Sequence, residues 1–288
     1  MVIALLPYGK PDNHRSLLAS LPIDSALLFE GDGAGKQTLG DLTANDHLIL
    51  VASSRALTAS LRGLNCRPSL LLQEPVAIKP RFYTFCRFFS GRYHRVLTHS
   101  TTLLSKLTNA RFAAHGGSFL LPPKVGDPPK QNRISLIASS KNTTKGHRLR
   151  HQIAAWSKQA SPDLQMFGTG YQRVEDKREA HDGYFFSVCI ENSRTPGYFT
   201  EKLIDSFLCR SLPVYWGAQD ITHFFDPRGM ICCTTETELQ AVIRNVTVAD
   251  YSVRLPYLNE NIQRALEFAD FYANGVNVLK REDEVTRR

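Results

Sequence analysis

Short apolar segments alternate with longer stretches of mixed polarity along the chain, and this alternation constrains the fold more than any other feature. Apolar runs of this length are typical of buried strands, and strands alternating with helices are typical of doubly wound α/β sheets. The expected strands are Val2–Leu6, Ala26–Phe29, His47–Ala52, Ser69–Leu72, Arg95–Leu97 and Arg111–Phe112, then Ile134–Ala138, Leu164–Phe167, Phe185–Ile190, Leu212–Tyr215 and Met230–Cys233. The expected helices are Ser54–Arg62, Thr101–Thr108, His147–Lys158, Thr200–Arg210 and Glu236–Asn245. The pattern predicts an α/β protein with two Rossmann-like domains.

A proline-rich segment separates the two series of strands. Leu121–Lys130 contains four prolines and one glycine, a composition typical of a stiff linker. We therefore expect a first domain over residues 1–122, a second over residues 131–275, and a charged tail over residues 276–288. A helix-like stretch at about Pro256–Arg281 could pack back across the first domain.

The segment Phe185–Pro227 carries the clearest functional signal. Its first strand ends at Glu191-Asn192, and a helix opens at Thr200 after a short loop. Polar groups at the carboxyl end of a strand, facing a helix N-terminus, favour an anion because free N–H groups and the helix dipole attract negative charge. Lys202, in the first turn of that helix, opposes the dipole and so indicates an anionic partner. The sequence thus predicts a phosphate site here.

The same segment resembles the donor-site block of the α-1,3/4-fucosyltransferases, glycosyltransferase family 10. The matching pieces are Glu191-Asn192-Ser193, Tyr198-Phe199-Thr200-Glu201-Lys202, Pro213-Val214-Tyr215-Trp216-Gly217 and Phe225-Asp226-Pro227. The resemblance implies the glycosyltransferase B architecture, in which two Rossmann-like domains face a cleft. It also implies that Glu201 contacts the sugar, that Lys202 contacts the phosphates, and that Asn192 and Tyr198 are donor contacts. Glu191 could instead be structural and bind loop amides.

A basic segment, Lys141–His151, follows the strand Ile134–Ala138 and occupies the first strand-to-helix turn of the second domain. Basic side chains in such a turn can reach a pyrophosphate at the helix N-terminus. The resemblance implies a phosphate-contacting arginine here; Arg150 fits the register best, and Arg148 is the alternative. A solvated basic loop is the other interpretation. Gly168-Thr169-Gly170, after another strand, would either let a nucleotide approach the backbone or form an ordinary tight turn.

The candidate general base lies in the first domain. Glycosyl transfer with inversion needs a carboxylate that takes the proton of the acceptor hydroxyl. Glu74 ends the segment after Ser69–Leu72 and precedes Pro75. Family 10 members often carry Glu followed shortly by Pro at this point, commonly as Glu-Ser-Pro, and here one residue is missing. Glu30 and Asp32 are the alternatives.

Neither a phosphate loop of the Walker type nor a metal motif is found in the sequence. Gly31–Thr38 is glycine-rich, but Glu30 and Gln37 stand where a Walker A motif needs Gly and Ser or Thr. This loop is expected to line the cleft. No clear Asp-x-Asp motif is present either, so Lys202 and the arginines would balance the phosphate charge. We expect no metal requirement and no cofactor besides the donor substrate.

The charge and hydropathy of the chain limit the kinds of partner that it is expected to bind. The chain has 35 Lys and Arg against 27 Asp and Glu, a formal net charge of +8, which suits a polyanionic ligand, a membrane phosphate surface or nucleic acid. No zinc-finger or RNA-binding signature is present, so nucleic acid is not expected. No apolar run approaches the ~20 residues that span a bilayer, and Val2–Leu6 is too short for a signal peptide. A cytoplasmic location is expected, with any peripheral membrane contact through the basic surface.

These expectations describe an inverting fucosyltransferase that moves fucose from GDP-fucose to a hydroxyl of an oligosaccharide or glycoconjugate. By resemblance, the acceptor would be N-acetylglucosamine and the linkage α-1,3. Two alternatives stay open: the same fold with another nucleotide-sugar donor, and a catalytically inactive protein that binds a nucleotide or polyanion. The shortened Gln73-Glu74-Pro75 motif is the feature that keeps the second alternative open.

Overall fold

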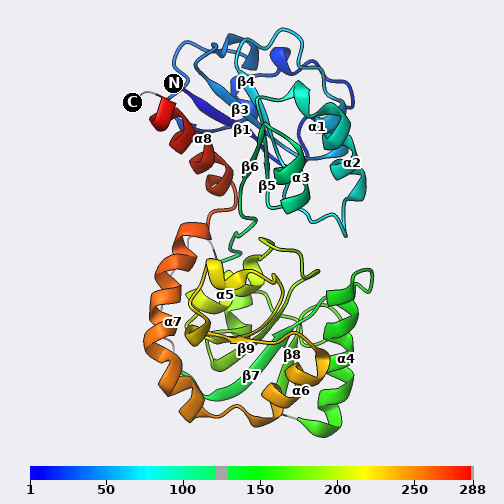
Figure 1. The fold of residues 1–288 in the computed structure, drawn as a ribbon, viewed down its shortest axis with the longest axis vertical. Coiled ribbons are helices and arrows are strands. Elements are labelled where there is room, and N and C mark those ends of the chain that lie inside the picture. The colour runs from blue at the N-terminus through cyan, green and yellow to red at the C-terminus, as the bar shows by residue number, and fades with distance from the viewer. Residues whose placement is uncertain (121–128, 162, 287–288) are drawn as a thin grey trace. The chain divides into compact units, whose positions relative to one another are not determined.

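The computed structural model of the protein describes residues 1–120, 129–161 and 163–286. The chain forms two compact units, one of Met1–His115 with Tyr272–Arg288 and the other of Gly116–Phe271. Each unit contains a largely or wholly parallel sheet flanked by helices, so the predicted class of two Rossmann-like α/β units is confirmed (Figure 1). Most of the linker predicted at Leu121–Lys130 lies outside the described residues.

The sheet of the first unit has six strands in the order β2-β1-β3-β4-β5-β6. The strands are β1 (Ile3–Leu6), β2 (Leu27–Glu30), β3 (His47–Val51), β4 (Arg67–Leu71), β5 (Arg95–Thr98) and β6 (Ala110–Phe112). Strands β1 and β3 to β6 are parallel, whereas β2 runs antiparallel to β1. Because β2 runs in the opposite direction, Glu30 pairs with Ile3 at the amino ends of the parallel strands.

Helices cover both faces of this first sheet. Helices α1 (Ser54–Thr58), α2 (Pro80–Phe89) and α3 (Thr101–Lys106) lie together on one face (Figure 1). The core under them includes every second residue of the strands, among them Leu48, Leu50, Leu70, Leu72 and Val96. The intervening residues Ile3, Leu5, Ile49, Val51, Leu71 and Leu97 pack on the other face with Val276 and Leu279 of α8 (Ala273–Thr286). This division follows from the two-residue period of strands.

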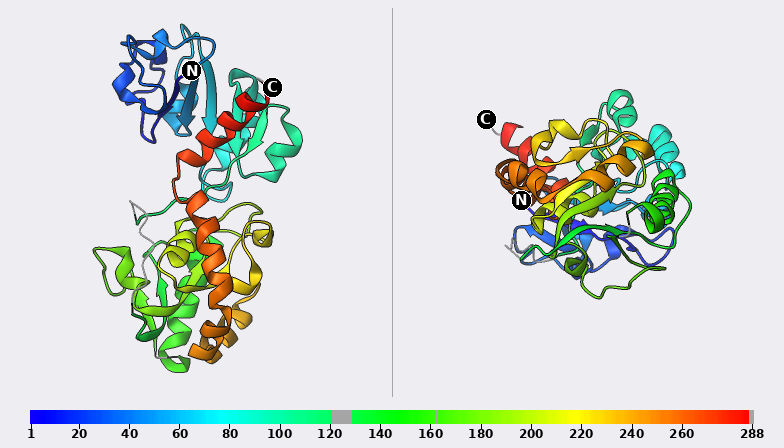
Figure 2. Two further views of the ribbon diagram at one scale, coloured as in Figure 1. Left: turned by 90° about the vertical axis from the view of Figure 1, so that its left-hand side faces the viewer. Right: turned by 90° about the horizontal axis from the view of Figure 1, so that it is seen from below.

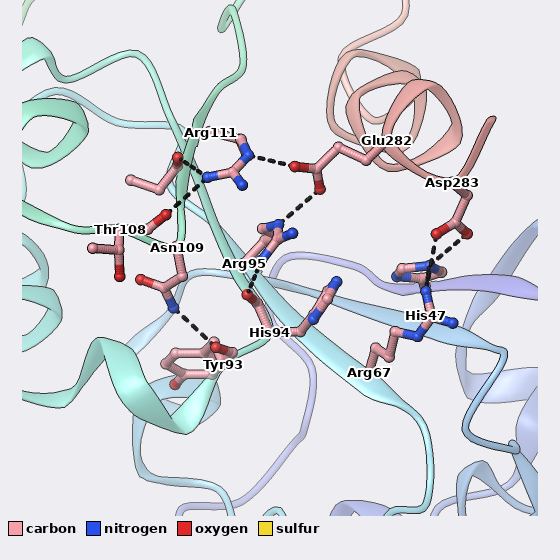
Figure 3. Close-up of polar contacts among 11 residues, drawn as sticks. His47, Arg67, Tyr93, His94, Arg95, Thr108, Asn109, Arg111, Glu282 and Asp283 are labelled. Atoms are coloured by element: carbon pink, nitrogen blue, oxygen red, sulfur yellow. Dashed lines mark hydrogen bonds and ion pairs between the residues drawn. The ribbon is translucent and has the colours of Figure 1, made fainter. Parts of the chain in front are cut away.

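Ion pairs fasten α8 to the amino ends of the first sheet (Figure 3). Glu282 binds Arg95 and Arg111, and Asp283 binds Arg67 and His47. From the sequence, a charged tail is expected over residues 276–288 and one helix at about Pro256–Arg281. The structure instead has two helices, α7 (Val248–Phe268) and α8, and the charges of α8 are paired with the strands of the first unit. The expectation that the last helix packs on the first domain agrees with this arrangement.

The second unit has a wholly parallel five-stranded sheet in the order β11-β10-β9-β7-β8. The strands are β7 (Asn132–Ile137), β8 (Leu164–Phe167), β9 (Tyr184–Ile190), β10 (Leu212–Trp216) and β11 (Ile231–Cys232). The helices are α4 (Lys145–Ala160), α5 (Glu201–Leu208), α6 (Glu236–Asn245) and α7. Helix α4 packs against α6, and α5 packs against α7, which runs along the side of this unit (Figures 1 and 2).

Strand order in the second sheet changes direction beside β7. The chain passes from β7 to β8 on one side and then returns to β9 on the other side. In open α/β sheets, ligands bind outside the carboxyl ends of the strands at such a switch point. The first place to look for a ligand site is therefore where β7 and β9 end.

Single 3-10 turns complete the fold: Leu18–Ser20, Ile23–Ser25, Leu39–Asp41, Ser90–Arg92, Lys177–Ala180, Ile221–His223 and Pro227–Gly229. Within the described ranges, no helix combines the length and the apolar character that crossing a membrane requires.

Candidate active site

Two of the predicted donor residues meet at the switch point of the second sheet. Arg150 lies in α4, which follows β7, and Asn192 lies two residues beyond the end of β9. The Arg150 guanidinium donates through Nε and Nη2 to the carbonyl oxygen of Ile190, at 2.9 and 2.7 Å, and through Nη2 to Oδ1 of Asn192 at 2.8 Å. The structure thus joins two residues that the sequence analysis selected from separate motifs.

Gly146 permits this close approach of α4 to the end of β9. Its N–H donates to the carbonyl oxygen of Asn192 at 3.3 Å. A Cβ at position 146 would lie 1.7 Å from the carbonyl oxygen of Glu191 and 3.0 Å from Cα of Asn192, so no larger residue fits without moving the backbone. The sequence analysis did not single out Gly146; a glycine in the first turn of the helix was the available signal.

Arg150 and Arg148, the two candidates for the phosphate-binding arginine, lie in different environments. Arg150 is buried, and burial lowers the pKa of its guanidinium, opposed by the charges of Glu191 and Glu201. Its Nη1 hydrogens take no part in the bonds to Ile190 and Asn192. Arg148 is exposed and donates from Nη1 to the carbonyl oxygen of Thr143 at 3.3 Å. Only Arg150 is therefore integrated into the strand ends.

Glu191 is structural, as one interpretation of the sequence proposed. It is completely buried, at 0% exposure. Its carboxylate accepts the N–H of Thr200 on Oε1 and the hydroxyl of Thr200 on Oε2, both at 2.8 Å. Burial raises the pKa of Glu191, while the charge of Lys202 and the bonds from Thr200 oppose that shift. Glu191 therefore ties the end of β9 to the start of α5.

Lys202 lies near two carboxylates of the protein, those of Glu201 and Glu191. Its Nζ donates to Oε1 of Glu201 at 2.7 Å and to the hydroxyl of Thr200, the N-cap of α5, at 3.2 Å. Burial lowers the pKa of Lys202, but the charges of Glu201 and Glu191 outweigh it, and the pKa lies above its ordinary value. The position of the lysine at a helix start is thus explained by these carboxylates and does not by itself require a phosphate.

Asn192 is held from both sides. Besides accepting from Arg150, it donates from Nδ2 to the hydroxyl of Tyr198 at 3.5 Å. Tyr198 is 1% exposed, so its ring belongs to the core of the second unit and its hydroxyl faces the amide. These contacts fix the orientation of Asn192 at the end of β9.

A second buried carboxylate lies one turn beyond Glu201. Asp205 accepts the hydroxyl of Ser118 at 2.7 Å and the N–H of Phe119 at 3.2 Å, both on Oδ1. Burial is the main cause that raises the pKa of Asp205 to about 7. Lys177 lies above the Phe119 ring, 3.5 Å from its centroid, and burial lowers the pKa of its ammonium group. Asp205 is not among the predicted site residues, although an acid within an apolar helix face is a visible signal in the sequence.

Gly168 is explained by packing. It has a φ of +105°, and a Cβ there would lie 2.2 Å from the carbonyl oxygen of Ala138. Its own carbonyl accepts the N–H of Tyr171 at 3.0 Å, which closes a tight turn. The alternative of an ordinary turn therefore accounts for this glycine without a ligand.

In the first unit, Glu74 lies beyond the carboxyl end of β4. Its side chain is half-buried, and its carbonyl oxygen accepts the hydroxyl of Tyr83 at 2.8 Å. The same hydroxyl lies 3.4 Å from Nε2 of His99, which follows β5. Tyr83 thus holds the backbone at Glu74 in place.

The alternative bases lie at the amino ends of the parallel strands of the same sheet, whereas Glu74 lies at the carboxyl ends. Glu30 ends the antiparallel strand β2, pairs with Lys280 and lies beside the start of β1. Asp32 follows it in the glycine-rich loop and accepts the N–H of Ala34 at 2.9 Å. Of these three acids, Glu74 is the one at the carboxyl ends of the parallel strands, where sites in such sheets form.

Over the ranges that the structure describes, no group of three or more His, Cys, Asp or Glu side chains has a geometry suited to a metal ion. The expectation that no metal is required stays a prediction.

The fold defines the class of protein. A solved α1,3-fucosyltransferase with GDP matches 79% of this chain and 77% of its own, with a TM-score of 0.50 and 16% identity. Sucrose-phosphate synthase from Thermosynechococcus elongatus matches 84% of this chain and 74% of its own, with a TM-score of 0.56 and 10% identity. At these identities the similarity shows the fold, which is that of the glycosyltransferases of B architecture.

The sequence of the second unit matches a family model. Residues 128–252 match the family model of glycosyltransferase family 10 (fucosyltransferase), C-terminal part. Most of the second unit is therefore similar to the C-terminal part of family 10, the family that the resemblance predicted.

Two relatives support the same family. The α-(1,3)-fucosyltransferase FucT of Helicobacter pylori is 29% identical over 105 residues, which are 36% of this chain and 22% of that protein. A putative fucosyltransferase, R654, of Acanthamoeba polyphaga mimivirus is 35% identical over 75 residues, 25% of this chain and 12% of that protein. The matched segments thus span less than a quarter of either relative.

Proposed function

We propose that this protein transfers fucose from GDP-fucose to a hydroxyl group of a glycan acceptor, with inversion at the sugar carbon. The observation that supports this most directly is the Arg150–Asn192 contact at the switch point of a sheet that lies within the match to family 10. A switch point is where a doubly wound sheet binds a nucleotide. The donor would lie with its diphosphate at the start of α4.

Donor binding would rearrange the Glu201–Lys202 pair. The side chains are partly accessible, at 18% and 23% exposure, so a diphosphate can reach them. Lys202 would turn from the carboxylate of Glu201 to the phosphates, because a diphosphate carries more negative charge than one carboxylate. Glu201 would then accept hydroxyl groups of the sugar. Arg150 would meet the phosphates through Nη1.

In the reaction, Glu74 would take the proton of the acceptor hydroxyl as its oxygen attacks the anomeric carbon. The bond from that carbon to the β-phosphate oxygen breaks, and GDP leaves from the opposite face. A β-linked donor thereby gives an α-fucoside. Negative charge grows on the departing GDP, and Lys202 and Arg150 would stabilise it without a metal ion.

Calorimetric titration in the presence of EDTA tests the donor and the metal independence together. GDP and GDP-fucose are expected to bind with micromolar affinity, and GDP-mannose and UDP-galactose more weakly. Lys202→Ala removes a charge-assisted contact of about 1.5–3 kcal/mol and should weaken GDP binding roughly 10- to 100-fold. Preferred binding of a UDP-sugar would overturn the fucose assignment, and binding only after a divalent ion is added would overturn the metal independence.

Glu74→Gln separates an enzyme from an inactive binder. The substitution should lower transfer to an N-acetyllactosamine acceptor by roughly 10²- to 10⁴-fold, while the affinity for GDP-fucose stays unchanged. A variant that turns over at the parent rate would show that another group is the base. A parent protein that binds GDP-fucose but transfers to no acceptor and hydrolyses no donor would favour the binding protein.

A further inference from the structure

The last two residues of α2 expose aromatic side chains that the proposed reaction does not use. Phe88 is 74% exposed and Phe89 is 52% exposed. Lys79, Arg81 and Arg87 lie on the same helix or at its start. These five residues are called the α2 surface below. Rings this exposed keep half or more of their surface in water, so they add little to the stability of the core.

Helix geometry keeps these rings outside. Tyr83 and Cys86 face the core of the first unit, and Phe88 lies on the other side of the helix at 100° per residue. Phe89 packs against Phe85 one turn earlier, with ring centroids 5.0 Å apart. Phe85 itself lies against the core. Phe89 is therefore held against Phe85, and Phe88 lies on the side of the helix that faces away from the core.

The charged side chains that α2 and α3 contribute all have the same sign. Between Glu74 and Asp127 the sequence contains no aspartate or glutamate, and this segment includes α2 and the neighbouring helix α3. Arg81 and Arg87 are exposed on α2, and Lys106 is exposed at the end of α3. The exposed rings therefore share their helix with cations, and the segment supplies no carboxylate to neutralise them.

We propose that the α2 surface docks the first unit on a bilayer that contains anionic phospholipids. Phe88 and Phe89 would enter the boundary between headgroups and acyl chains, where aromatic side chains are favoured, and the basic side chains would meet the lipid phosphates. Two adjacent rings offer little apolar area for a stable protein interface. A few aromatic side chains combined with several cations are, in contrast, enough for reversible membrane binding.

Co-sedimentation of the full chain with lipid vesicles tests this docking independently of fucosyl transfer. The protein should sediment with vesicles of phosphatidylcholine and phosphatidylserine and stay in solution with phosphatidylcholine alone. Added salt should release it, because screening weakens the attraction to the headgroups. The double variant Phe88→Ser/Phe89→Ser should lower the binding constant about tenfold or more, and Arg81→Gln about fivefold.

Tyr8→Ser is the matched control, since Tyr8 is an aromatic residue of the same unit with 58% exposure. It should bind vesicles as the parent does, and circular dichroism melts should be the same for all variants. Equal sedimentation with neutral vesicles, or full binding by the double variant, would overturn the proposal. So would a parent dimer that the double variant abolishes, or retention on heparin without binding to vesicles.

Discussion

Replacing Gly146 by alanine should disrupt the switch point of the second sheet. The new Cβ would lie 1.7 Å from the carbonyl oxygen of Glu191 and 2.8 Å from its carbonyl carbon. Both neighbours are backbone at the end of a central strand, so no flexible side chain can move aside. The start of α4 would have to shift, which would break the bond from Gly146 to Asn192 and pull Arg150 away from Ile190.

The expected cost combines two effects. Overpacking in a well-packed region costs about 1–3 kcal/mol, and a lost backbone hydrogen bond costs about 1 kcal/mol more. We expect the second unit to lose about 2–4 kcal/mol, which for a unit of this size lowers its melting temperature by roughly 4–16 °C. GDP affinity should fall as well, because the displaced atoms form the proposed phosphate site.

Tryptophan fluorescence during urea unfolding measures the stability of the second unit, where the loss is expected. The protein has two tryptophans, Trp156 and Trp216, and both lie in the second unit. Gly91→Ala is the control, since a Cβ at Gly91 meets nothing within 4 Å, and it should leave the midpoint unchanged. A Gly146→Ala protein with the parent midpoint and the parent affinity for GDP would refute the reasoning.

Two further predictions concern buried and paired charges. The pKa of Asp205 is raised to about 7, so between pH 4 and pH 7 the folded state holds a proton that the unfolded state has released. The free energy of unfolding of the second unit should therefore fall by up to about 4 kcal/mol as the pH rises from 4 to 7. Asp205→Asn keeps an oxygen that can accept the hydroxyl of Ser118, and it should remove this pH dependence of the urea midpoint. A urea midpoint that changes with pH as in the parent protein would contradict the prediction. Glu282→Gln weakens the pairs with Arg95 and Arg111, which are partly exposed, so α8 should open about 1 kcal/mol more easily and exchange its amides faster at low salt. Exchange at the parent rate would show that the apolar contacts of α8 alone hold it.

The strands could be predicted because each is a short apolar run bounded by polar residues or glycine, and most observed ends lie within two residues of the predicted ones. The direction of β2 could not, since a four-residue run carries no information on which way it pairs. Helix α2 was not predicted because its outward positions carry Phe88 and Phe89 where an amphipathic pattern has polar residues. Pro256 suggested a helix start, but it lies inside α7.

The candidate site, too, could be predicted from the sequence only in part. Motif and position were enough to select Arg150 and Asn192, which the structure joins at 2.8 Å. The partners of Lys202 could not be foreseen, because whether a carboxylate or a ligand neutralises a lysine depends on side-chain directions that spacing does not give. Gly146 was missed for a similar reason: its importance comes from the backbone of Glu191, about 45 residues away in sequence.

The first unit is built from two separate parts of the chain, and this has a consequence for synthesis on the ribosome. Residues Met1–His115 emerge first, but Val276 and Leu279, which cover one face of their sheet, emerge only after the whole second unit. The second unit is continuous and can finish folding while that apolar face of the first is still uncovered. For as long as it takes to translate Gly116–Phe271, about 10–30 s at roughly 5–20 residues per second, the nascent chain would present a binding surface for chaperones.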